Sequence, residues 1–178
     1  MKFVILLRGV NVGGNNKLPM ADLRTALTSQ GLENVSSYIA SGNVFADSSL
    51  GSVELAAVVR LAILDSFGLD IAVLVRTQDE LVSVAERNPF DHITDHAKLA
   101  ISFLESEPNP LNITALRTAN PEPEQFVIDG TTMYAYYPNG LGQTKLTPTL
   151  IDRKLKTSST TRNLNTLRKL IELSLVRS

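Results

Sequence analysis

The run FVILL at residues 3–7 decides how the first half of the chain folds. A short continuous run of apolar residues is typical of a strand that is buried on both faces. A loop rich in Gly and Asn follows at residues 8–17, and Pro19 suits the first turn of a helix. The four-residue spacing of Leu23 and Leu27 predicts that this helix turns one apolar face toward the core.

Two strands, a second helix and a further strand are expected in the rest of the first 76 residues. The strands are predicted at residues 35–39, 44–46 and 71–75, and the helix at residues 53–67 with Gly68 as its stop. The order is then strand-helix-strand-strand-helix-strand. This order matches the split βαβ of the ferredoxin-like fold, an antiparallel four-stranded sheet with both helices on one face.

The second half is predicted to be a variant of the same arrangement, a rough echo of element order that suggests duplication. Strands are expected at residues 99–104, 126–128 and 133–137, the last two pairing as a hairpin across Asp129-Gly130. Helices are expected at residues 77–88, 111–118 and 147–155, and from about Asn163 onward. The sequence therefore predicts an α+β protein of two ferredoxin-like units packed as one body. These are an N-terminal unit at residues 1–76 and a C-terminal αβ unit at residues 77–178 with two closing helices.

Charge is segregated along the chain, although the net charge is only −1. Residues 1–30 carry four Lys or Arg and one acidic residue, and residues 140–178 carry eight and two. The middle, residues 31–139, carries five basic and fifteen acidic residues. Basic ends of this kind indicate an anionic partner, either a phosphate-bearing small molecule or a nucleic acid; the alternative is the solvated face of exposed helices.

Composition excludes several kinds of site. The chain has no Cys, which excludes a disulfide framework, a thiolate zinc site and a cysteine nucleophile. Its two His are too few for a His-rich metal cage. The apolar run after Lys2 stops at Arg8, which is shorter than the apolar region of a signal peptide, and no other run is long enough to span a bilayer. We expect a cytoplasmic protein with no membrane segment, no cofactor and no metal.

The loop at residues 8–17 is the strongest local signal for ligand binding. Its glycines can adopt positive φ, and successive N–H groups there can form a concave nest for an anion. Its Arg and Lys add positive charge, and its Asn side chains can donate hydrogen bonds without titrating. The spacing fits neither a Walker A loop nor a dinucleotide fingerprint, and the alternative is a tight glycine-rich connection. The candidate ligand-binding residues in this loop are Arg8, Asn11, Gly13, Gly14, Asn15 and Lys17.

Two further segments carry candidate ligand-binding residues. Ser41 and Asn43 lie in the turn between the second and third strands, where a role in the turn is favoured because no G-x-S-x-G elbow surrounds Ser41. Thr, Arg and Asn donors gather at residues 160–166 near a predicted helix start, where a plain N-cap is the alternative. The donors beyond one cap predict a contribution to the same anion site from Lys145, Thr161, Arg162 and Asn163.

Two other patterns are favoured to have no binding role. Asp91-His92 and Asp95-His96 form a D-H-x-x-D-H pattern that could hold a metal on a helix, but Pro89 and Thr94 favour a solvated loop. Tyr134, Tyr136 and Tyr137 sit on one hairpin and could stack on bases, but strand aromatics usually pack in a core and the RNP pattern is absent.

Several motifs resemble those of one protein family along nearly the whole chain. They are Leu6–Met20, Tyr38–Val44, Leu74–Thr77, Asn88–Phe90, Tyr137–Gly140, Lys145-Leu146 and Thr160–Thr166. They are similar to the domain-of-unknown-function 1697 family of mostly bacterial proteins. The sequence departs from that family's usual pattern at Ala40, Gln143, Thr144 and Leu164. The resemblance implies an α+β fold of two ferredoxin-like units, and it implies no activity.

Three functions follow as hypotheses. The first is binding of a phosphate-bearing or other anionic small ligand by the 8–17 loop together with Lys145 and the Thr160–Asn163 segment. It requires the two basic ends of the chain to meet. If catalysis occurs there, it would be electrostatic, because no convincing general base is visible. The second is a nucleic-acid-binding module that uses the basic ends. The third is a structural or interaction protein in which the motifs only fix turns.

Overall fold

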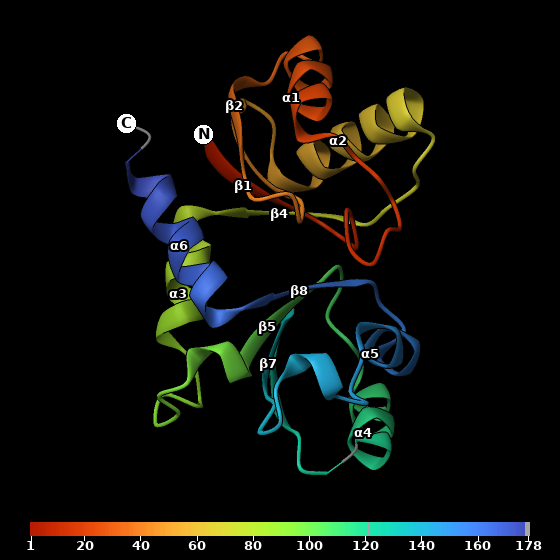
Figure 1. The fold of residues 1–178 in the computed structure, drawn as a ribbon, viewed down its shortest axis with the longest axis vertical. Helices are drawn as coiled ribbons and strands as arrows, with labels where there is room; N and C mark the ends of the chain where they lie inside the picture. Colours follow the sequence, from red (N-terminus) through yellow and green to blue (C-terminus); the bar gives the residue numbers. More distant parts are fainter. Residues whose placement is uncertain (121, 177–178) are drawn as a thin grey trace. The chain divides into compact units, whose positions relative to one another are not determined.

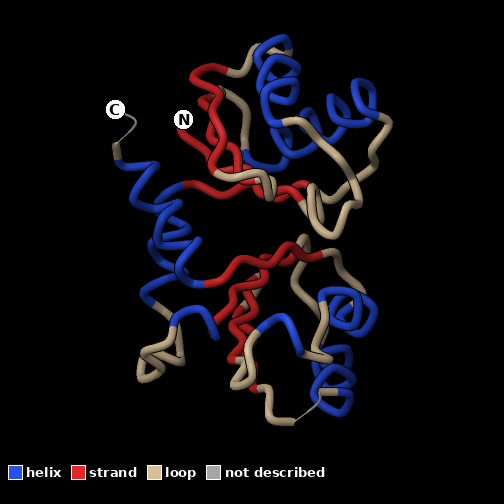
Figure 2. The backbone as a smooth tube through the Cα atoms, viewed as in Figure 1, coloured by secondary structure: helices blue, strands red, loops and turns tan. Residues whose placement is uncertain are grey.

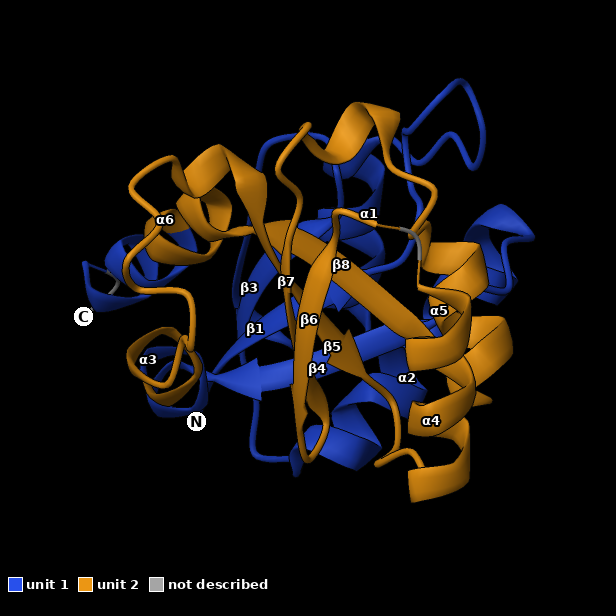
Figure 3. Ribbon diagram, turned by 90° about the horizontal axis from the view of Figure 1, so that it is seen from below, with its two compact units in different colours: residues 1–82, 170–178 blue, residues 83–169 orange. Residues whose placement is uncertain are grey.

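The structure is a computed structural model, and it describes residues 1–120 and 122–176. The chain is a mixed α+β protein with two antiparallel four-stranded sheets (Figure 1). It divides into two compact units, coloured separately in Figure 3. Unit 1 comprises Met1–Val82 and Leu170–Ser178, and unit 2 comprises Ser83–Lys169.

Unit 1 contains the predicted order of strands and helices. Its elements are β1 (Lys2–Leu7), α1 (Met20–Ser29), β2 (Glu33–Tyr38), β3 (Asn43–Asp47), α2 (Ser52–Phe67) and β4 (Val73–Thr77). The strands lie in the order β2-β3-β1-β4, and each neighbouring pair is antiparallel.

The core of unit 1 forms where alternate residues of β1 meet the two helices. Phe3, Ile5 and Leu7 belong to one buried cluster with Leu23 of α1 and Leu55 of α2. The residues between them point to the other face of the sheet, because side chains alternate along a strand. Val4 and Leu6 on that face are also buried, at 1% and 0% exposure. The prediction of a strand buried on both faces is therefore confirmed.

Helix α3 (Gln78–Glu86) begins with a capping box between Thr77 and Glu80. The backbone N–H of Thr77 donates to Glu80 Oε2 over 2.7 Å, and the Glu80 N–H donates to Thr77 Oγ1 over 3.2 Å. Two N–H groups that the first turn would leave without partners are satisfied in this way.

The sheet of unit 2 is formed by β5 (Leu99–Leu104), β6 (Gln125–Asp129), β7 (Thr132–Tyr136) and β8 (Ser159–Asn163), in the antiparallel order β6-β7-β5-β8. Its helices are α4 (Pro110–Ala119) and α5 (Pro148–Leu155), with 3-10 turns η1 (His96–Lys98) and η2 (Leu141–Gln143). From β5 to β8, unit 2 has the same strand-helix-strand-strand-helix-strand order as unit 1 from β1 to β4. Figure 2 colours the helices and strands of both units. Helix α6 (Leu164–Leu175) follows β8, and its residues from Leu170 onward belong to unit 1. The turn between β6 and β7 is Gly130-Thr131, one residue later than predicted.

Strand β8 is a correction to the sequence analysis, which assigned three strands to this half and placed residues 160–163 at a helix start. The segment pairs with β5 along its whole length, from Ser159 opposite Leu104 to Asn163 opposite Ala100. Its residues are Ser, Thr, Thr, Arg and Asn, so no apolar alternation marks it as a strand.

No helix of the described residues is both long and apolar enough to cross a membrane.

Candidate functional site

The 8–17 loop is a small hairpin. The Asn11 N–H donates to the Asn16 carbonyl and the Asn15 N–H donates to the Val12 carbonyl, each over 3.1 Å. Gly13 and Gly14 connect the two sides with φ of +59° and +78°. Positive φ at both central positions is the signature of the turn that best joins short antiparallel segments, and glycine adopts it without steric cost.

Asn11 fixes this hairpin to the rest of unit 1. Its φ is +55°, and its Oδ1 accepts from the Leu18 N–H over 2.9 Å. Its Nδ2 donates to the Leu18 carbonyl over 2.8 Å and to the Ala40 carbonyl over 2.7 Å. The side chain predicted to contact a ligand therefore directs its polar atoms at the loop and the neighbouring turn.

The tip of the hairpin is exposed to solvent. Gly13, Gly14, Asn15 and Lys17 all have exposed side chains or backbone. Within the described residues, the N–H groups of Gly13 and Gly14 donate no hydrogen bond. Helix α1 begins just after the loop, and its N-cap, Pro19, provides no side-chain hydrogen bond to the first turn. N–H donors, a lysine and a helix N-terminus thus occur together, which is chemistry suited to an anion.

The turn at residues 39–42 packs directly beneath the loop. Gly42 has φ +81°, and a Cβ added there would lie 2.6 Å from Val10 Cγ2 and 2.8 Å from Leu7 Cβ. Asn43 is fully buried, and its Nδ2 donates to the Tyr38 carbonyl and to Ser41 Oγ, each over 3.3 Å. Ser41 and Asn43 therefore have the turn contacts that the sequence analysis favoured over a nucleophile.

The other four candidate ligand-binding residues lie in unit 2. Lys145 is exposed. Thr161 Oγ1 lies 2.7 Å from Ser102 Oγ on the neighbouring strand β5. Asn163 Oδ1 accepts from the Thr166 N–H over 2.8 Å, so Asn163 has the N-cap contact that the sequence analysis gave as the alternative to ligand binding.

Arg162 is the most buried cation of this set. Its Nη1 donates to Thr160 Oγ1 over 2.9 Å and to the Thr161 carbonyl over 2.8 Å. Burial lowers the pKa of the guanidinium to about 10, because the charged form loses its hydration. The structure thus groups the unit 1 candidates around the 8–17 loop and the adjoining turn, and it places three of the four unit 2 candidates on β8. Lys145 lies outside β8, in the segment between η2 and α5.

The D-H-x-x-D-H segment is mostly loop. Asp95 Oδ1 accepts from the Ala97 N–H over 3.3 Å at the start of η1, and His96 Nδ1 lies 3.0 Å from Arg168 Nη1. Among the residues that the structure describes, no group of three or more His, Asp and Glu side chains is placed to hold a metal ion.

Two of the hairpin tyrosines, Tyr134 in β7 and Tyr137 just after it, are buried in unit 2. Tyr134 is 1% exposed, its hydroxyl donates to the Val84 carbonyl over 3.1 Å, and burial raises its pKa. Burial also raises the pKa of Tyr137 to about 12, with a further contribution from the Glu124 carboxylate. The core role that the sequence analysis favoured is confirmed for these two rings.

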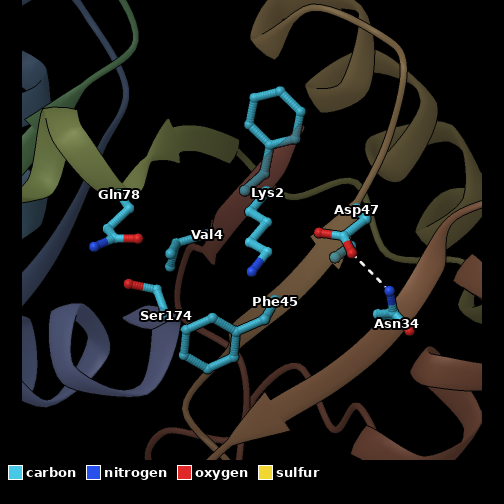
Figure 4. Close-up of a pocket in the computed structure, with 9 residues that line it drawn as sticks. Lys2, Val4, Asn34, Phe45, Asp47, Gln78 and Ser174 are labelled. Atoms are coloured by element: carbon cyan, nitrogen blue, oxygen red, sulfur yellow. Dashed lines mark hydrogen bonds between the residues drawn. The ribbon is translucent and has the colours of Figure 1, made fainter. Parts of the chain in front are cut away.

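The sequence analysis missed a shallow hollow in unit 1 that is open to solvent (Figure 4). Its charged groups, Lys2 and Asp47, lie opposite each other on β1 and β3. Gln78 of α3 and Ser174 of α6 complete the polar lining. These residues are scattered along the chain, and only the strand register brings the two charges together. The predicted strands carried no register, so no signal in the sequence joined them.

Two βαββαβ units, each with one antiparallel four-stranded sheet, define the class of this α+β protein. The chain belongs to the family described as protein of unknown function (DUF1697), whose model matches residues 1–134. The resemblance seen in the sequence is therefore confirmed, and the function of the family is unknown.

One solved structure shares the fold over nearly the whole chain. It is that of the conserved bacterial protein SP0830 from Streptococcus pneumoniae, with a TM-score of 0.72 and 23% identity. The match covers 97% of this chain and 98% of that one. No curated protein matches the chain.

Proposed function

We propose that the chain binds a phosphate-bearing or other anionic small molecule at the 8–17 loop of unit 1. The observation that carries this proposal is a difference between two equivalent connections. Unit 1 joins β1 to α1 through the twelve residues 8–19, whereas unit 2 joins β5 to α4 through the five residues 105–109. Positive φ occurs at five residues of the longer connection and at none of the shorter one. Joining strand to helix in this fold does not require the long loop.

The chemistry of the loop supports an anion over other ligands. Lys17 is exposed beside the hairpin, and Arg8 stands where β1 ends. Gly13 and Gly14 are exposed and, within the described residues, their N–H groups donate no hydrogen bond, so they can donate to an oxyanion. The proposal relies on unit 1 alone.

We also propose that each unit is ferredoxin-like and that the two arose by duplication. The order β2-β3-β1-β4 in unit 1 corresponds strand for strand to β6-β7-β5-β8 in unit 2. In both units one helix follows the first strand and another follows the third, which supports the split βαβ arrangement.

The binding proposal is tested by isothermal titration of the full chain with inorganic phosphate and with ATP. Lys17→Ala is the test variant, because the side chain is exposed and its loss should leave the fold intact. Lys2→Ala is the matched control, a cation at the opposite end of β1. We expect Lys17→Ala to weaken binding about tenfold, the effect of losing one charge-assisted hydrogen bond.

Equal affinity in wild type and Lys17→Ala, or equal weakening in Lys2→Ala, would overturn the proposal. Titration with single-stranded DNA over a salt series separates the nucleic-acid hypothesis. A nucleic-acid module would bind DNA with affinity that falls steeply with added salt, and it would not bind phosphate or ATP.

A further inference from the structure

Two exposed apolar side chains lie beside the 8–17 loop of unit 1. Val12 in the hairpin is 58% exposed, and Ile39 in the turn beneath it is 51% exposed. Their neighbours in the chain are joined by the hydrogen bond from Asn11 Nδ2 to the Ala40 carbonyl over 2.7 Å, which holds the two segments together. Neither side chain packs into the core of the unit. The fold therefore leaves an apolar patch, Val12 and Ile39, in contact with water.

Isoleucine is poorly suited to the backbone at position 39. Its φ is +51°, in the left-handed region, where a β-branched side chain is strongly disfavoured. The other two non-glycine residues with positive φ in this corner, Asn11 and Asn16, are of the type that tolerates such backbone. A single exposed apolar residue is ordinary on a protein surface, but Ile39 adds backbone strain to its exposure. A ligand that packs against the side chain would explain why an isoleucine stands there.

The donors of the hairpin stand directly beside this patch. Gly13 and Gly14 follow Val12 in the chain, and consecutive Cα atoms are about 3.8 Å apart. In the part of the chain that the structure describes, the N–H groups of these glycines donate no hydrogen bond, and Lys17 forms no ion pair. A phosphate ester bound through these groups would therefore hold the substituent on its ester oxygen within reach of the Val12 side chain.

We propose that the ligand at this loop is a phosphate monoester that carries a flat aromatic ring. The phosphate would occupy the anion site of the proposed function, on which this proposal rests, and bind Gly13, Gly14 and Lys17. The ring would cover Val12 and Ile39. Inorganic phosphate leaves that patch in water, whereas an aryl ester buries it and gains affinity from the hydrophobic effect. A rigid ring also loses less conformational freedom on binding than an alkyl chain of similar size.

The ligand class is tested by isothermal titration of the full chain with phenyl phosphate, butyl phosphate and methyl phosphate, three monoesters of the same charge. We expect phenyl phosphate to bind about tenfold more tightly than methyl phosphate, with butyl phosphate between them. Equal affinity for phenyl and methyl phosphate would overturn the ring-binding proposal and leave anion binding intact. Butyl phosphate bound as tightly as phenyl phosphate would overturn the preference for a ring. Binding of none of the esters and of no inorganic phosphate would overturn the proposed function itself.

Ile39→Asn separates a binding role from a structural one. We expect it to weaken phenyl phosphate binding about threefold, its share of the tenfold, and to leave methyl phosphate binding unchanged. The urea midpoint should rise, because asparagine accepts the left-handed backbone more readily than isoleucine. Leu61→Asn, at a side chain of α2 that is 58% exposed, is the matched control and should not change either affinity. Wild-type affinity for phenyl phosphate in Ile39→Asn, or a lower urea midpoint, would contradict the assignment.

Discussion

The two units differ most in their strand-to-helix connections and hairpin turns. They share the order of strands and helices, yet the first connection is twelve residues long in unit 1 and five in unit 2. The hairpin turns differ as well. Gly42 of unit 1 is pressed against Val10 and Leu7, whereas a side chain at Gly130 of unit 2 would meet no atom within 4 Å. Three non-glycine residues with positive φ, Asn11, Asn16 and Ile39, also lie in this corner of unit 1, and such backbone is often found at functional sites.

The largest expected effect comes from filling the corner at Gly42. Gly42→Ala would place a Cβ only 2.6 Å from Val10 Cγ2 and 2.8 Å from Leu7 Cβ. The residue would also have to keep φ at +81°. The left-handed backbone and the overpacked side chain together should lower the free energy of unfolding by about 3 kcal/mol. Gly130→Ala, at φ +56° with open space around it, should cost about 1 kcal/mol. Urea denaturation followed by circular dichroism measures both, and equal costs would show that the two turns are equivalent.

The next largest effect is expected at the Asn residues that fix the two strand-to-helix connections. Asn11→Ala removes three hydrogen bonds and leaves alanine at φ +55°, so we expect a loss of about 3 kcal/mol. Asn109→Ala in unit 2 removes one hydrogen bond, the N-cap in which Asn109 Oδ1 accepts from the Asn112 N–H over 2.9 Å. We expect this change to lower the free energy of unfolding by about 1 kcal/mol. Similar losses in the same denaturation assay would mean that the long loop is no more firmly held than the short connection.

The sequence allowed the elements of unit 1 to be predicted because each is marked by local chemistry. The apolar run at residues 3–7, the stop at Gly68 and the capping box at Thr77 all act within a few residues. The same holds for the Asn163 cap. Strand β8 escaped detection because its polar residues gain their strand conformation from pairing with β5, which lies about 60 residues earlier in the chain.

The candidate sites show the same limit. The 8–17 loop could be recognised as special from its glycines and asparagines, because positive φ is a local property. The roles of its members could not, because Asn11 points at Ala40 only in the folded unit. The hollow around Lys2 and Asp47 depends on strand register, which a one-residue slip would change for every side chain.

Buried tyrosines give unit 2 a pH dependence of its own. The pKa of Tyr137 is about 12 in the folded chain, against an ordinary value of 10.0. Between these values the unfolded chain loses the phenolic proton first, so stability falls as pH rises above 10. The fall should be about 1 kcal/mol between pH 10 and 11. Tyr137→Phe should reduce this fall in urea denaturation series, and an unchanged pH dependence would contradict burial as its cause.

The smallest effects are expected where the units are alike, at a surface Arg–Asp pair in each. Arg60 Nε lies 2.7 Å from Asp70 Oδ1 in unit 1, and Arg87 Nη1 lies 2.8 Å from Asp129 Oδ2 in unit 2. The Arg60 hydrogen bond lowers the pKa of Asp70, so NMR titration of Arg60→Ala should show that pKa returning toward its usual value.

Arg87→Ala should change the free energy of unfolding by no more than about 0.5 kcal/mol, because the side chains of Arg87 and Asp129 are both half-exposed and solvent screens the pair. The unfolding midpoint of Arg60→Ala should not move measurably, since the side chains of Arg60 and Asp70 are both largely exposed and solvent screens the pair. A clear loss of stability in either variant would mean that surface ion pairs contribute to the difference in stability between the units. Without such a loss, the difference lies in the packed turn at Gly42 and the hydrogen bonds of Asn11.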